Sequence, residues 1–582
     1  MTKSPLNRLD YLMCYSRRHF RWIIIVSISF IVVYLCDTPF PSTSASFSRV
    51  TITKSSYDWS VWQPRYPVES IEPLPTAIVK KLAQIQHAPT RHPRFGIGVQ
   101  EKRREEVRQT MLKGWKSYKE RAWMRDELMP LTGSGQDTFG GWAATMVDAM
   151  DTLWIMGLKK EFGEAVRAVV TLDWAQVQGT ACNMFETTIR HLGGLLSAYD
   201  LSREPALLAK AVELGDMLYA GFDTPNHMPP FWFDFEKAKT GNLVPDDHQP
   251  AASAATLSLE FTRLAQLTGQ DKYYDVVARV AERLYENQNL TKLPGMWPAF
   301  FDLKNGVFNH DNTFTLGALS DSMYEYVLKM HILLGATEPK YEQLYRATAD
   351  TIIKNLLFRP MTPNNLDILF AGTYRVGKDV PLEPEGQHLA CFAGGMFAMG
   401  GKIFGIPEHV SIGARLTEGC MWAYNAFSTG LAPEIFKLIP CKSLSGCIWD
   451  EQKWLNAVNT DADGHGRLPK GFQNARDPRY ILRPEALESV FILYRITGQE
   501  EYRDAAWKMF RSIQAATSTL YGNAAIEDVT VTGTPQQRGS MESFWMAETL
   551  KYLYLTFSPA DMISLDDYVF NTECHPFRIP KS

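Results

Sequence analysis

Apolar residues recur at helical spacing along most of the chain, from about residue 103 to about residue 557. The stretch at residues 183–200 is typical and reads NMFETTIRHLGGLLSAYD. Its apolar side chains share one face of a helix, as expected for a buried surface: Phe185, Ile189, Leu192, Leu195, Leu196 and Tyr199. Alternation typical of strands is scarce, so the pattern predicts an all-α fold.

Glu186 and Arg190 lie one helical turn apart within this apolar stretch. An ordinary i,i+4 salt bridge, worth about 0.3–0.5 kcal/mol, is the commoner explanation for such a spacing. Because burying a charge is costly unless the charge is paired or used, the two residues also mark a candidate functional position. The spacing alone leaves both interpretations open.

A loose internal repeat runs through the helical region. Residues 259–284 and 487–513 each read as a helix, a Thr-Gly-Gln turn and a second helix, and residues 189–218 and 321–352 follow the same plan. Helix hairpins of this size cannot bury their apolar faces alone, so they must stack. The repeat therefore predicts either a closed ring of hairpins or an open solenoid.

Carboxylates occupy corresponding positions in successive hairpins. They lie in the first helices: Glu186, Glu260, Asp321, Glu485, Glu488, Glu542 and Glu548. The helix dipole usually explains a single acid near a helix N-terminus. If the first helices line a ring, however, their acids converge on one cavity, with Trp142, Phe544 and Trp545 as aromatic surface beside them.

Convergent acids beside aromatic side chains suggest two kinds of chemistry. Glycoside hydrolysis needs one carboxyl kept protonated and another ionised, and crowding separates their pKa values. A hard cation such as Ca²⁺ prefers the oxygen ligands that the same acids offer. The sequence has no HExxH, paired CxxC, P-loop or GxSxG motif, so zinc hydrolysis, redox chemistry and nucleotide use have little support.

The first 95 residues differ from the rest of the chain. Basic residues precede an uncharged run at 22–36, which as a helix would span roughly 22 Å, and a segment rich in Ser, Thr and Pro follows it. These features predict a cytoplasmic tail (1–21), a transmembrane signal anchor (22–36), a stem (37–95) and one lumenal catalytic domain (96–582). A cleaved signal peptide is the alternative, because its apolar region has a similar length.

Charge and cysteine content narrow the setting. The formal net charge of −4 provides no field for binding nucleic acid, and the sequence has no long basic run. In an oxidising lumen, Cys391, Cys420, Cys441 and Cys447 could pair as disulfides, whereas four buried thiols would be normal in the cytosol. A sequon at Asn289 also fits a lumenal chain, although such tripeptides often occur by chance.

Seven motifs are recognisable between about Trp115 and Pro576. They read GGWAATMVDAMDTLWIMGL (140–158), FETTIRHLGGLLSAYDLS (185–202), LGALSDSMYEYVLKMH (316–331), HLACFAGGM (388–396), LRPEALESVFILYRITG (482–498), MESFWMAETLKYLYL (541–555) and FNTECHP (570–576). Together, and in this order, they resemble the class I α1,2-mannosidases of glycoside hydrolase family 47.

The resemblance implies an (α/α)7 barrel and inverting hydrolysis of terminal α1,2-linked mannose from N-glycans. Glu186 matches the family's candidate general acid, Asp321 a second acid that acts directly or through water, and Glu485 the base that activates water. The residues expected to contact substrate or to surround a Ca²⁺ ion are Arg190, Arg483, Glu488, Phe544, Glu548, Glu434, Glu260 and Leu319. His388 is expected to be structural.

The resemblance also implies a Ca²⁺ ion and a disulfide. Thr572 matches the threonine that ligates Ca²⁺ through its hydroxyl and carbonyl oxygens. As the only direct protein ligand, it would leave coordination sites for water and for the hydroxyls of mannose. Cys391 and Cys420 match the family's disulfide pair.

The chain departs from the family pattern at two positions. Ser253 stands where family members often have a glutamate, and Cys574 stands where an alanine is usual; Cys574 is either free or paired with Cys182. Leu319 bears on specificity, because related enzymes that remove a single mannose in the endoplasmic reticulum tend to carry arginine there. We therefore expect trimming of Man9GlcNAc2 or Man8GlcNAc2 toward Man5GlcNAc2.

The resulting hypothesis is a Ca²⁺-dependent mannosidase that acts as a monomer on high-mannose N-glycans of glycoproteins. It would be a single-pass type II protein of the Golgi or endoplasmic reticulum membrane, with its catalytic domain in the lumen. The alternative is a glycan-binding quality-control module of the same fold with weak or no activity; Ser253 leaves room for it. A structural helical-repeat scaffold would not explain why acids recur on the same helices.

Overall fold

The computed structural model describes residues 50–76, 82–88, 97–458 and 468–581. Residues from Ile52 onward form one compact unit. The predicted tail and anchor (1–21 and 22–36) lie outside the described residues. Of the helices that are described, none has both the length and the apolar character needed to cross a membrane.

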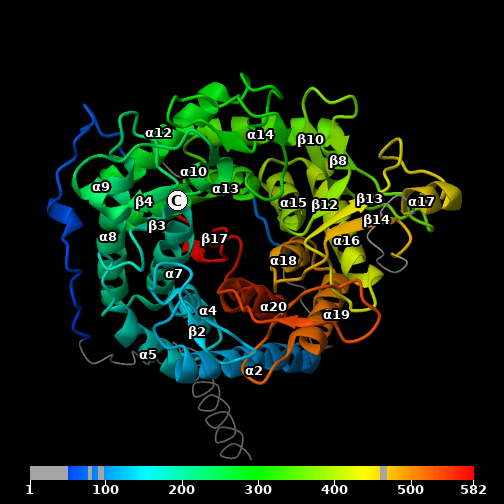
Figure 1. Ribbon diagram of the computed structural model, residues 1–582, viewed down its shortest axis with the longest axis horizontal. Coiled ribbons are helices and arrows are strands. Elements are labelled where there is room, and N and C mark those ends of the chain that lie inside the picture. Colours follow the sequence, from blue (N-terminus) through cyan, green and yellow to red (C-terminus); the bar gives the residue numbers. More distant parts are fainter. Residues whose placement is uncertain (1–49, 77–81, 89–96, 459–467, 582) are drawn as a thin grey trace, which may run out of the picture. The chain divides into compact units, whose positions relative to one another are not determined.

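Seven helix pairs form the described part of this unit, and in each pair one helix lines the centre while the other covers it (Figure 1). The inner helices are α4 (Met150–Ile155), α7 (Gly193–Ser202), α11 (Ser258–Thr268), α13 (Asp321–Leu333), α15 (Ala393–Ile403), α18 (Glu485–Thr497) and α20 (Leu550–Thr556). Their outer partners, in the same order, are α5 (Lys159–Val169), α8 (Pro205–Tyr219), α12 (Asp271–Asn287), α14 (Pro339–Asn355), α16 (Pro407–Ala426), α19 (Glu500–Thr517) and α2 (Ile97–Arg121).

The ring of inner helices is closed. Each inner helix contacts the next, and the π-helical segment η5 (Trp545–Thr549), which leads into α20, contacts α4 at the start of the ring. The (α/α)7 barrel is therefore confirmed, and the open solenoid is wrong.

The hairpins form where the sequence repeat places them. Gly269 and Gly498 end α11 and α18 in the left-handed conformation, with φ of +68° and +71°, which glycine adopts without steric cost. The inner helix α18 is buried at every position from Ala486 to Ile496. Its outer partner α19 buries one face only, as expected for a helix that covers the ring.

Short helices and strands connect the pairs, and the sequence pattern did not predict the strands. The other helical segments are η1 (Trp59–Val61), α3 (Ala144–Asp148), α6 (Met184–Glu186), η2 (Thr187–Leu192), η3 (Ala220–Phe222), α9 (Phe235–Lys239), α10 (Ala251–Ala255), η4 (Leu389–Phe392) and α17 (Glu451–Val458). The paired strands are β1 (Glu127–Leu128) with β2 (Gly135–Gln136), β3 (Ala181–Asn183) with β4 (Trp232–Asp234), β5 (Gln249–Pro250) with β6 (Phe300–Phe301), β8 (Leu357–Phe358) with β9 (Phe370–Ala371), and β15 (Ala525–Ile526) with β16 (Gln537–Arg538). Two three-stranded sheets join β7 (Thr313–Phe314), β10 (Thr373–Arg375) and β11 (Leu382–Glu383), and β12 (Glu385–Gln387), β13 (Ile435–Leu438) and β14 (Phe472–Asp477).

The C-terminal hairpin enters the ring. Its antiparallel strands β17 (Tyr568–Phe570) and β18 (Pro576–Arg578) contact α13 and α7, and Figure 1 shows β17 inside the circle of helices. The turn at residues 571–575 carries Thr572. The C-terminal hairpin therefore brings the predicted Ca²⁺ ligand to the inner helices.

The described part of the predicted stem packs against the helical unit. The Lys210 ammonium donates to the Thr53 carbonyl at 3.2 Å, and the Arg495 guanidinium donates to Gln86 Oε1 at 2.9 Å. Trp59 and Ile85 are buried. Residues 52–76 and 82–88 are thus attached to the barrel wall and do not form a free spacer.

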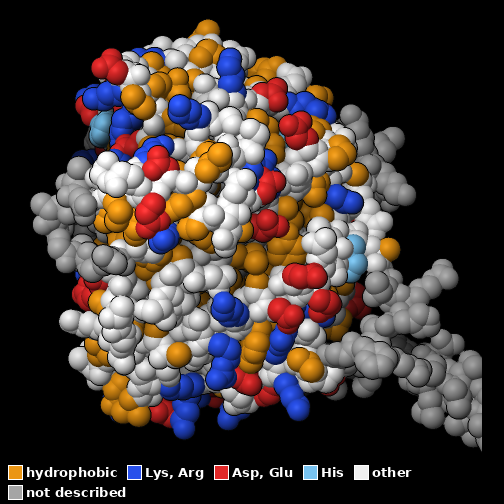
Figure 2. All heavy atoms as spheres, turned by 90° about the vertical axis from the view of Figure 1, so that its right-hand side faces the viewer, with side chains coloured by type: hydrophobic (Ala, Val, Ile, Leu, Met, Phe, Trp, Pro, Cys, Tyr) orange, Lys and Arg blue, Asp and Glu red, His pale blue; other side chains and the backbone are white. Residues whose placement is uncertain are grey.

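The surface seen from the right-hand side of Figure 1 carries interspersed positive and negative side chains (Figure 2). On this face, no large area has a single sign. The pattern agrees with the small net charge of the sequence.

Candidate active site

The acids predicted to converge lie at the starts of the inner helices. Asp321 and Glu485 are the first residues of α13 and α18, and Glu260 lies in the first turn of α11. Glu186 directly precedes the π-helical segment η2, and Glu548 lies within the second π-helical segment, η5. Segments of π-helix are rare and occur frequently at functional sites.

Arg190 joins Glu186 to the deeper part of the site. Its Nε lies 2.9 Å from Glu186 Oε2 and its Nη1 lies 2.8 Å from Glu573 Oε2. The guanidinium also lies over the rings of Phe139 and Phe544, 4.9 and 5.8 Å from their centroids. The Glu186 side chain is 30% exposed and that of Arg190 is 9% exposed, so a buried cation holds an open carboxylate.

Glu485 lies between two groups that favour its ionised form. His388 Nδ1 is 2.8 Å from Glu485 Oε2, and Arg483 Nη1 is 3.6 Å from Glu485 Oε1. Burial alone would raise the pKa of Glu485, but Arg483 and His388 outweigh burial and lower it. His388 is in turn held by Tyr424, whose hydroxyl lies 2.7 Å from Nε2. Glu485 is therefore kept as a carboxylate in a fixed orientation.

Arg483 also forms an ion pair with a second acid, Glu434. Its Nε donates to Glu434 Oε2 at 2.9 Å, and its guanidinium lies 5.6 Å from the centroid of the Phe544 ring. Phe544 therefore has the two arginines of the site, Arg190 and Arg483, over its ring.

Asp321 has the opposite electrostatics to Glu485. Burial raises its pKa to about 7, and the nearby charges of Glu325 and Glu485 act in the same direction. A backbone N–H of Ser322 and the charge of Arg483 compensate only in part. Two carboxyls at the starts of inner helices thus differ in protonation near neutral pH, as acid–base catalysis requires.

Further acids of the site are buried, and nearby positive charges compensate for their burial only in part. Burial raises the pKa of Glu488 to about 8, although Lys329 lies 3.6 Å away and also pairs with Glu325. Glu548 and Glu573 are hydrogen-bonded to each other, and burial raises the pKa of both, that of Glu573 to about 8.

Glu260 connects these acids to the turn of the C-terminal hairpin. Burial raises its pKa to about 7, and its Oε1 accepts hydrogen bonds from Tyr326 and Asn571. Its Oε2 is buried and has no partner among the described residues. The Thr572 N–H donates to the same Tyr326 hydroxyl at 3.3 Å.

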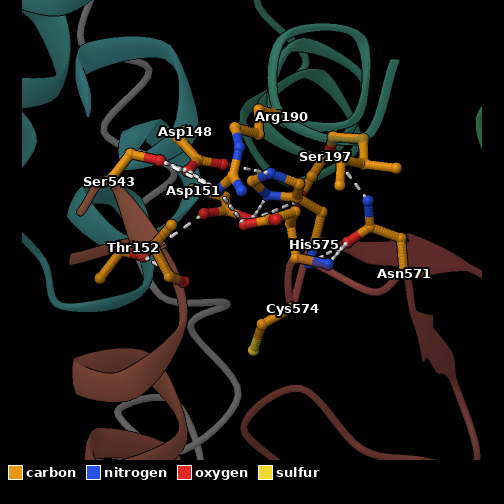
Figure 3. Close-up of polar contacts among 12 residues, drawn as sticks. Asp148, Asp151, Thr152, Arg190, Ser197, Ser543, Asn571, Cys574 and His575 are labelled. Carbon is orange, nitrogen blue, oxygen red and sulfur yellow. Dashed lines mark hydrogen bonds and ion pairs between the residues drawn. The ribbon is translucent and has the colours of Figure 1, made fainter. Parts of the chain in front are cut away.

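A buried network of ion pairs holds the turn at residues 571–575 in place (Figure 3). His575 lies between two aspartates, with Nε2 3.0 Å from Asp148 Oδ1 and Nδ1 2.8 Å from Asp151 Oδ2. Lys551 lies 2.8 Å from Asp151 Oδ1 and donates to the Cys574 carbonyl at 2.7 Å. Burial would raise the pKa of Asp151, but Lys551 and His575 lower it to about 2.

Asn571 completes the hold on the turn. Its Oδ1 accepts the backbone N–H groups of Glu573 and His575 at 2.9 and 2.8 Å. Its Nδ2 donates to Glu260 and to the Ile189 carbonyl, and Figure 3 shows Asn571 beside His575. The backbone around Thr572 is therefore tied to two inner-helix segments.

The oxygen groups around Thr572 fit a hard cation held largely through water. Among the described residues, no set of three or more His, Cys, Asp or Glu side chains is arranged to hold a metal directly. Burial nevertheless raises the pKa of several carboxyls here, and one oxygen of Glu260 lacks a partner among the described residues, so a bound cation would favour the ionised forms of these acids. Ca²⁺ accepts water, hydroxyl and carbonyl ligands of this kind.

Within the described ranges, the cysteines form two disulfides. Cys391 pairs with Cys420, as the family resemblance implied, and Cys441 pairs with Cys447. Cys182 and Cys574 are free and buried.

Leu319 and Ser253 lie close to each other near the start of α13. The Leu319 carbonyl accepts the Ala252 N–H at 2.8 Å, and Leu319 is 41% exposed with φ of 81°. Ser253 is buried and its hydroxyl donates to the Pro250 carbonyl at 2.7 Å. Leu319 therefore presents an uncharged side chain to solvent two residues before Asp321.

The sequence did not reveal several residues of the site. His388, which was left out of the predicted acid–base set, contacts Glu485 directly and orients it. Asp148, Asp151 and His575 meet across more than 400 residues of sequence. The available signal was the pair of acids three residues apart in an otherwise apolar helical motif, at positions 148 and 151.

Comparison with known proteins gives one consistent result. The chain matches glycosyl hydrolase family 47 over residues 110–579. It is 35% identical over 498 residues to mannosyl-oligosaccharide 1,2-alpha-mannosidase MNS1 of Arabidopsis thaliana, an alignment that covers 83% of this chain and 79% of that protein. It is 36% identical to the human endoplasmic reticulum mannosyl-oligosaccharide 1,2-alpha-mannosidase, over 82% of this chain and 64% of that protein.

A solved structure shows the same architecture. The α-1,2-mannosidase from Trichoderma reesei superposes with a TM-score of 0.72 at 29% sequence identity, covering 82% of this chain and 99% of that one. The similarity therefore extends over most of this chain.

Proposed function

Because the chain belongs to glycosyl hydrolase family 47, we propose that it hydrolyses terminal α1,2-linked mannose from high-mannose N-glycans with inversion at the anomeric carbon. The observation that carries the proposal is the opposite ionisation of Asp321, with a pKa raised to about 7, and Glu485, with a lowered pKa. Inverting hydrolysis needs one carboxyl to donate a proton and another to accept one. The enzyme names of the relatives support the substrate class. A module that only binds glycans is not favoured.

Glu485 is the base. It takes a proton from water while the water oxygen attacks the anomeric carbon, and His388 and Arg483 keep the carboxylate ionised and oriented. The bond between the anomeric carbon and the glycosidic oxygen breaks in the same step. The leaving oxygen receives its proton from an acid on the opposite side of the sugar.

Two carboxyls share the acid role. Glu186 is the more open one and is held by Arg190, so it is placed to contact the leaving group directly. Asp321 is half-protonated near pH 7 and supplies a proton directly or through water. Phe544, between Arg190 and Arg483, offers an aromatic surface for the sugar ring.

We assign Ca²⁺ to the turn at residues 571–575. Thr572 would hold it through its hydroxyl and carbonyl oxygens, and the surrounding acids, including Glu260, Glu488 and Glu548, would orient its water ligands. When bound, the ion supplies positive charge that grips and polarises sugar hydroxyls. Asn571 and His575 fix the turn before any ion arrives.

The open, uncharged Leu319 supports trimming of several branches, from Man9GlcNAc2 or Man8GlcNAc2 toward Man5GlcNAc2. An arginine at this position would extend a charge toward the substrate beside Asp321. The short Ser253, turned toward its own backbone, leaves the same region without a second acid.

The proposed setting is the secretory pathway, with the protein a monomer acting on glycoproteins in the lumen of the Golgi or endoplasmic reticulum. The uncharged run at 22–36 would anchor it as a type II membrane protein. The disulfide between Cys391 and Cys420 supports an oxidising compartment.

The test is hydrolysis of Man9GlcNAc2, followed by NMR so that both mannose release and the anomeric form of the product are recorded. Glu485→Gln should lower kcat by roughly 10²–10⁴-fold while glycan binding is retained. Glu500→Gln is the matched control, because Glu500 opens the outer helix α19 as Glu485 opens α18, and it should be unaffected. Unchanged turnover in Glu485→Gln, or release of the retained anomer, refutes the assignment.

A further inference from the structure

A cavity of 320 Å³ lies on the outer wall of the barrel, between the segment at residues 62–71 and the helices α8 and α12. This segment belongs to the dark blue coil at the left edge of Figure 1. The space is equivalent to about ten water molecules, which is in the range of small-ligand sites. The residues that line it are separate from the acids of the candidate active site.

Two buried aspartates hold the segment at either end of the cavity. Asp223 accepts the backbone N–H groups of Arg65 and Tyr66 at 2.9 and 2.7 Å. Asp275 accepts the Glu72 N–H at 2.7 Å and pairs with Arg279 at 2.9 Å. These hydrogen bonds hold the backbone of the segment on both sides of the cavity. The cavity is therefore formed without a ligand.

The lining combines aromatic rings with polar groups that are not used by the fold. Trp62, Tyr66, Tyr219 and Phe222 supply the rings. Glu69, His227, Tyr66 and Tyr219 also line the cavity, and their side-chain polar groups have no hydrogen-bond partner among the described residues. These groups include both donors and acceptors.

This combination selects one class of ligand. A pyranose has an apolar C–H face that packs on aromatic rings and an edge of hydroxyls that need mixed donors and acceptors. An anion such as phosphate is disfavoured. Among the described lining residues, Arg279 and His227 are the basic ones, and Arg279 is engaged by Asp275 and by the Ser70 carbonyl. A simple cation is also disfavoured, since Asp223 and Asp275 already accept hydrogen bonds from the segment.

We propose that this cavity is a second, non-catalytic saccharide site that binds a hexose ring of a glycan. The choice of mannose as the sugar rests on the proposed function. The inference that the cavity binds a hexose ring rests on the geometry of the site alone. Such a site would hold another arm of the same glycan, or a neighbouring glycan, against the outer wall while the ring centre acts on a terminal residue.

The test is titration of the full-length protein with methyl α-D-mannopyranoside, which has no α1,2 linkage to hydrolyse, followed by saturation-transfer NMR and calorimetry. The triple variant Glu69→Ala/His227→Asn/Tyr219→Phe removes the Glu69 carboxylate, the His227 imidazole and the Tyr219 hydroxyl, and it keeps the aromatic wall. Binding to the outer site should weaken at least tenfold in this variant, persist in Phe544→Ala, and be unchanged in Glu236→Ala, an exposed control on α9.

Hydrolysis of Man9GlcNAc2 is measured on the same preparations. Mannoside binding that disappears in Phe544→Ala and is unchanged in the triple variant overturns the inference, as does the absence of binding in every protein. If either of these two binding results is found together with normal hydrolysis of Man9GlcNAc2, the proposed function still stands. Outer-site binding without hydrolysis would instead refute the proposed function alone. Equal melting temperatures of wild type and triple variant exclude loss by unfolding.

Discussion

Replacing Asp151 with asparagine should destabilise the protein far more than the loss of an ordinary ion pair. Asp151 contacts Lys551 at 2.8 Å and His575 at 2.8 Å, and all three side chains are fully buried. Removing one partner from a buried ion pair leaves an uncompensated charge and costs about 3–5 kcal/mol. An exposed pair costs about 0–1 kcal/mol, so Asp504→Asn, which breaks the pair with Arg103, is the control.

The expected shift in Tm follows from the size of the compact unit. With an unfolding entropy of about 2.1 cal/mol/K per residue over roughly 530 residues, each kcal/mol lowers Tm by about 1 °C. Asp151→Asn should therefore lower Tm by about 3–5 °C, and the control by less than about 1 °C. Differential scanning calorimetry at pH 7 and a single scan rate measures both.

A double-mutant cycle tests the reasoning itself. Lys551→Met alone leaves Asp151 with less compensation, whereas combining it with Asp151→Leu removes both charges and refills much of the volume with apolar atoms. The double variant should therefore be more stable than the sum of the single changes predicts, by at least about 1 kcal/mol. Additive effects would show that the ion network contributes no coupling, and the account of the turn would fail.

Three further outcomes are expected. The rate of hydrolysis should fall as pH rises through about 7, because the pKa of Asp321 is raised to about 7 and its proton is lost above that pH; a pH–kcat/KM profile in which Asp321→Asn retains the same upper limb would contradict this. Cys391→Ser/Cys420→Ser should lower the free energy of unfolding by about 3–4 kcal/mol, because this disulfide joins residues 29 apart in sequence. Cys441→Ser/Cys447→Ser should lower it by about 2 kcal/mol, because those residues are 6 apart. Equal losses of Tm would argue against the loop-entropy explanation. Removing divalent cations with a chelator should abolish hydrolysis and lower Tm, and added Ca²⁺ should restore both; activity that persists in chelator would refute the Ca²⁺ assignment.

Acid should destabilise the protein in a defined window. Asp151 has a folded pKa of about 2, below the ordinary value of 3.8, so its contribution to stability is complete above about pH 4 and is lost as pH falls toward 2. The slope of Tm against pH between 4 and 2 should therefore be shallower in Asp151→Asn than in the wild type. Parallel slopes would show that other carboxyls control acid unfolding.

The helix pairs and the acids on them could be predicted because their signals are local. Periodicity and a glycine turn suffice to mark α11–α12 and α18–α19, and each acid sits within a motif of fewer than twenty residues. The closure of the ring could not be read from periodicity, since it depends on the contact between η5 and α4. The short strands were missed because pairs of two or three residues carry no alternation.

The least predictable feature is the one that ties the site together. Asp148 and His575 are 427 residues apart in sequence, and their contact exists only because the C-terminal hairpin enters the ring between α7 and α13. Neither residue type, taken alone, marks a site, because a buried aspartate or histidine is usually satisfied by a local partner. The contact is a property of the three-dimensional fold, and no local pattern in the sequence marks it.

Arg190 links the buried network to the open acid, and this determines which changes can be separated in an experiment. Its Nη1 lies 3.6 Å from Asp148 Oδ2 and 2.8 Å from Glu573, while its Nε holds Glu186. A substitution of Arg190 should therefore affect stability, the turn that carries Thr572, and the orientation of the acid at once. Glu186 can be changed without disturbing the network, because it contacts Arg190 from the exposed side. The role of the acid must consequently be tested at Glu186 itself, since a loss of activity at Arg190 would not distinguish catalysis from positioning of the turn.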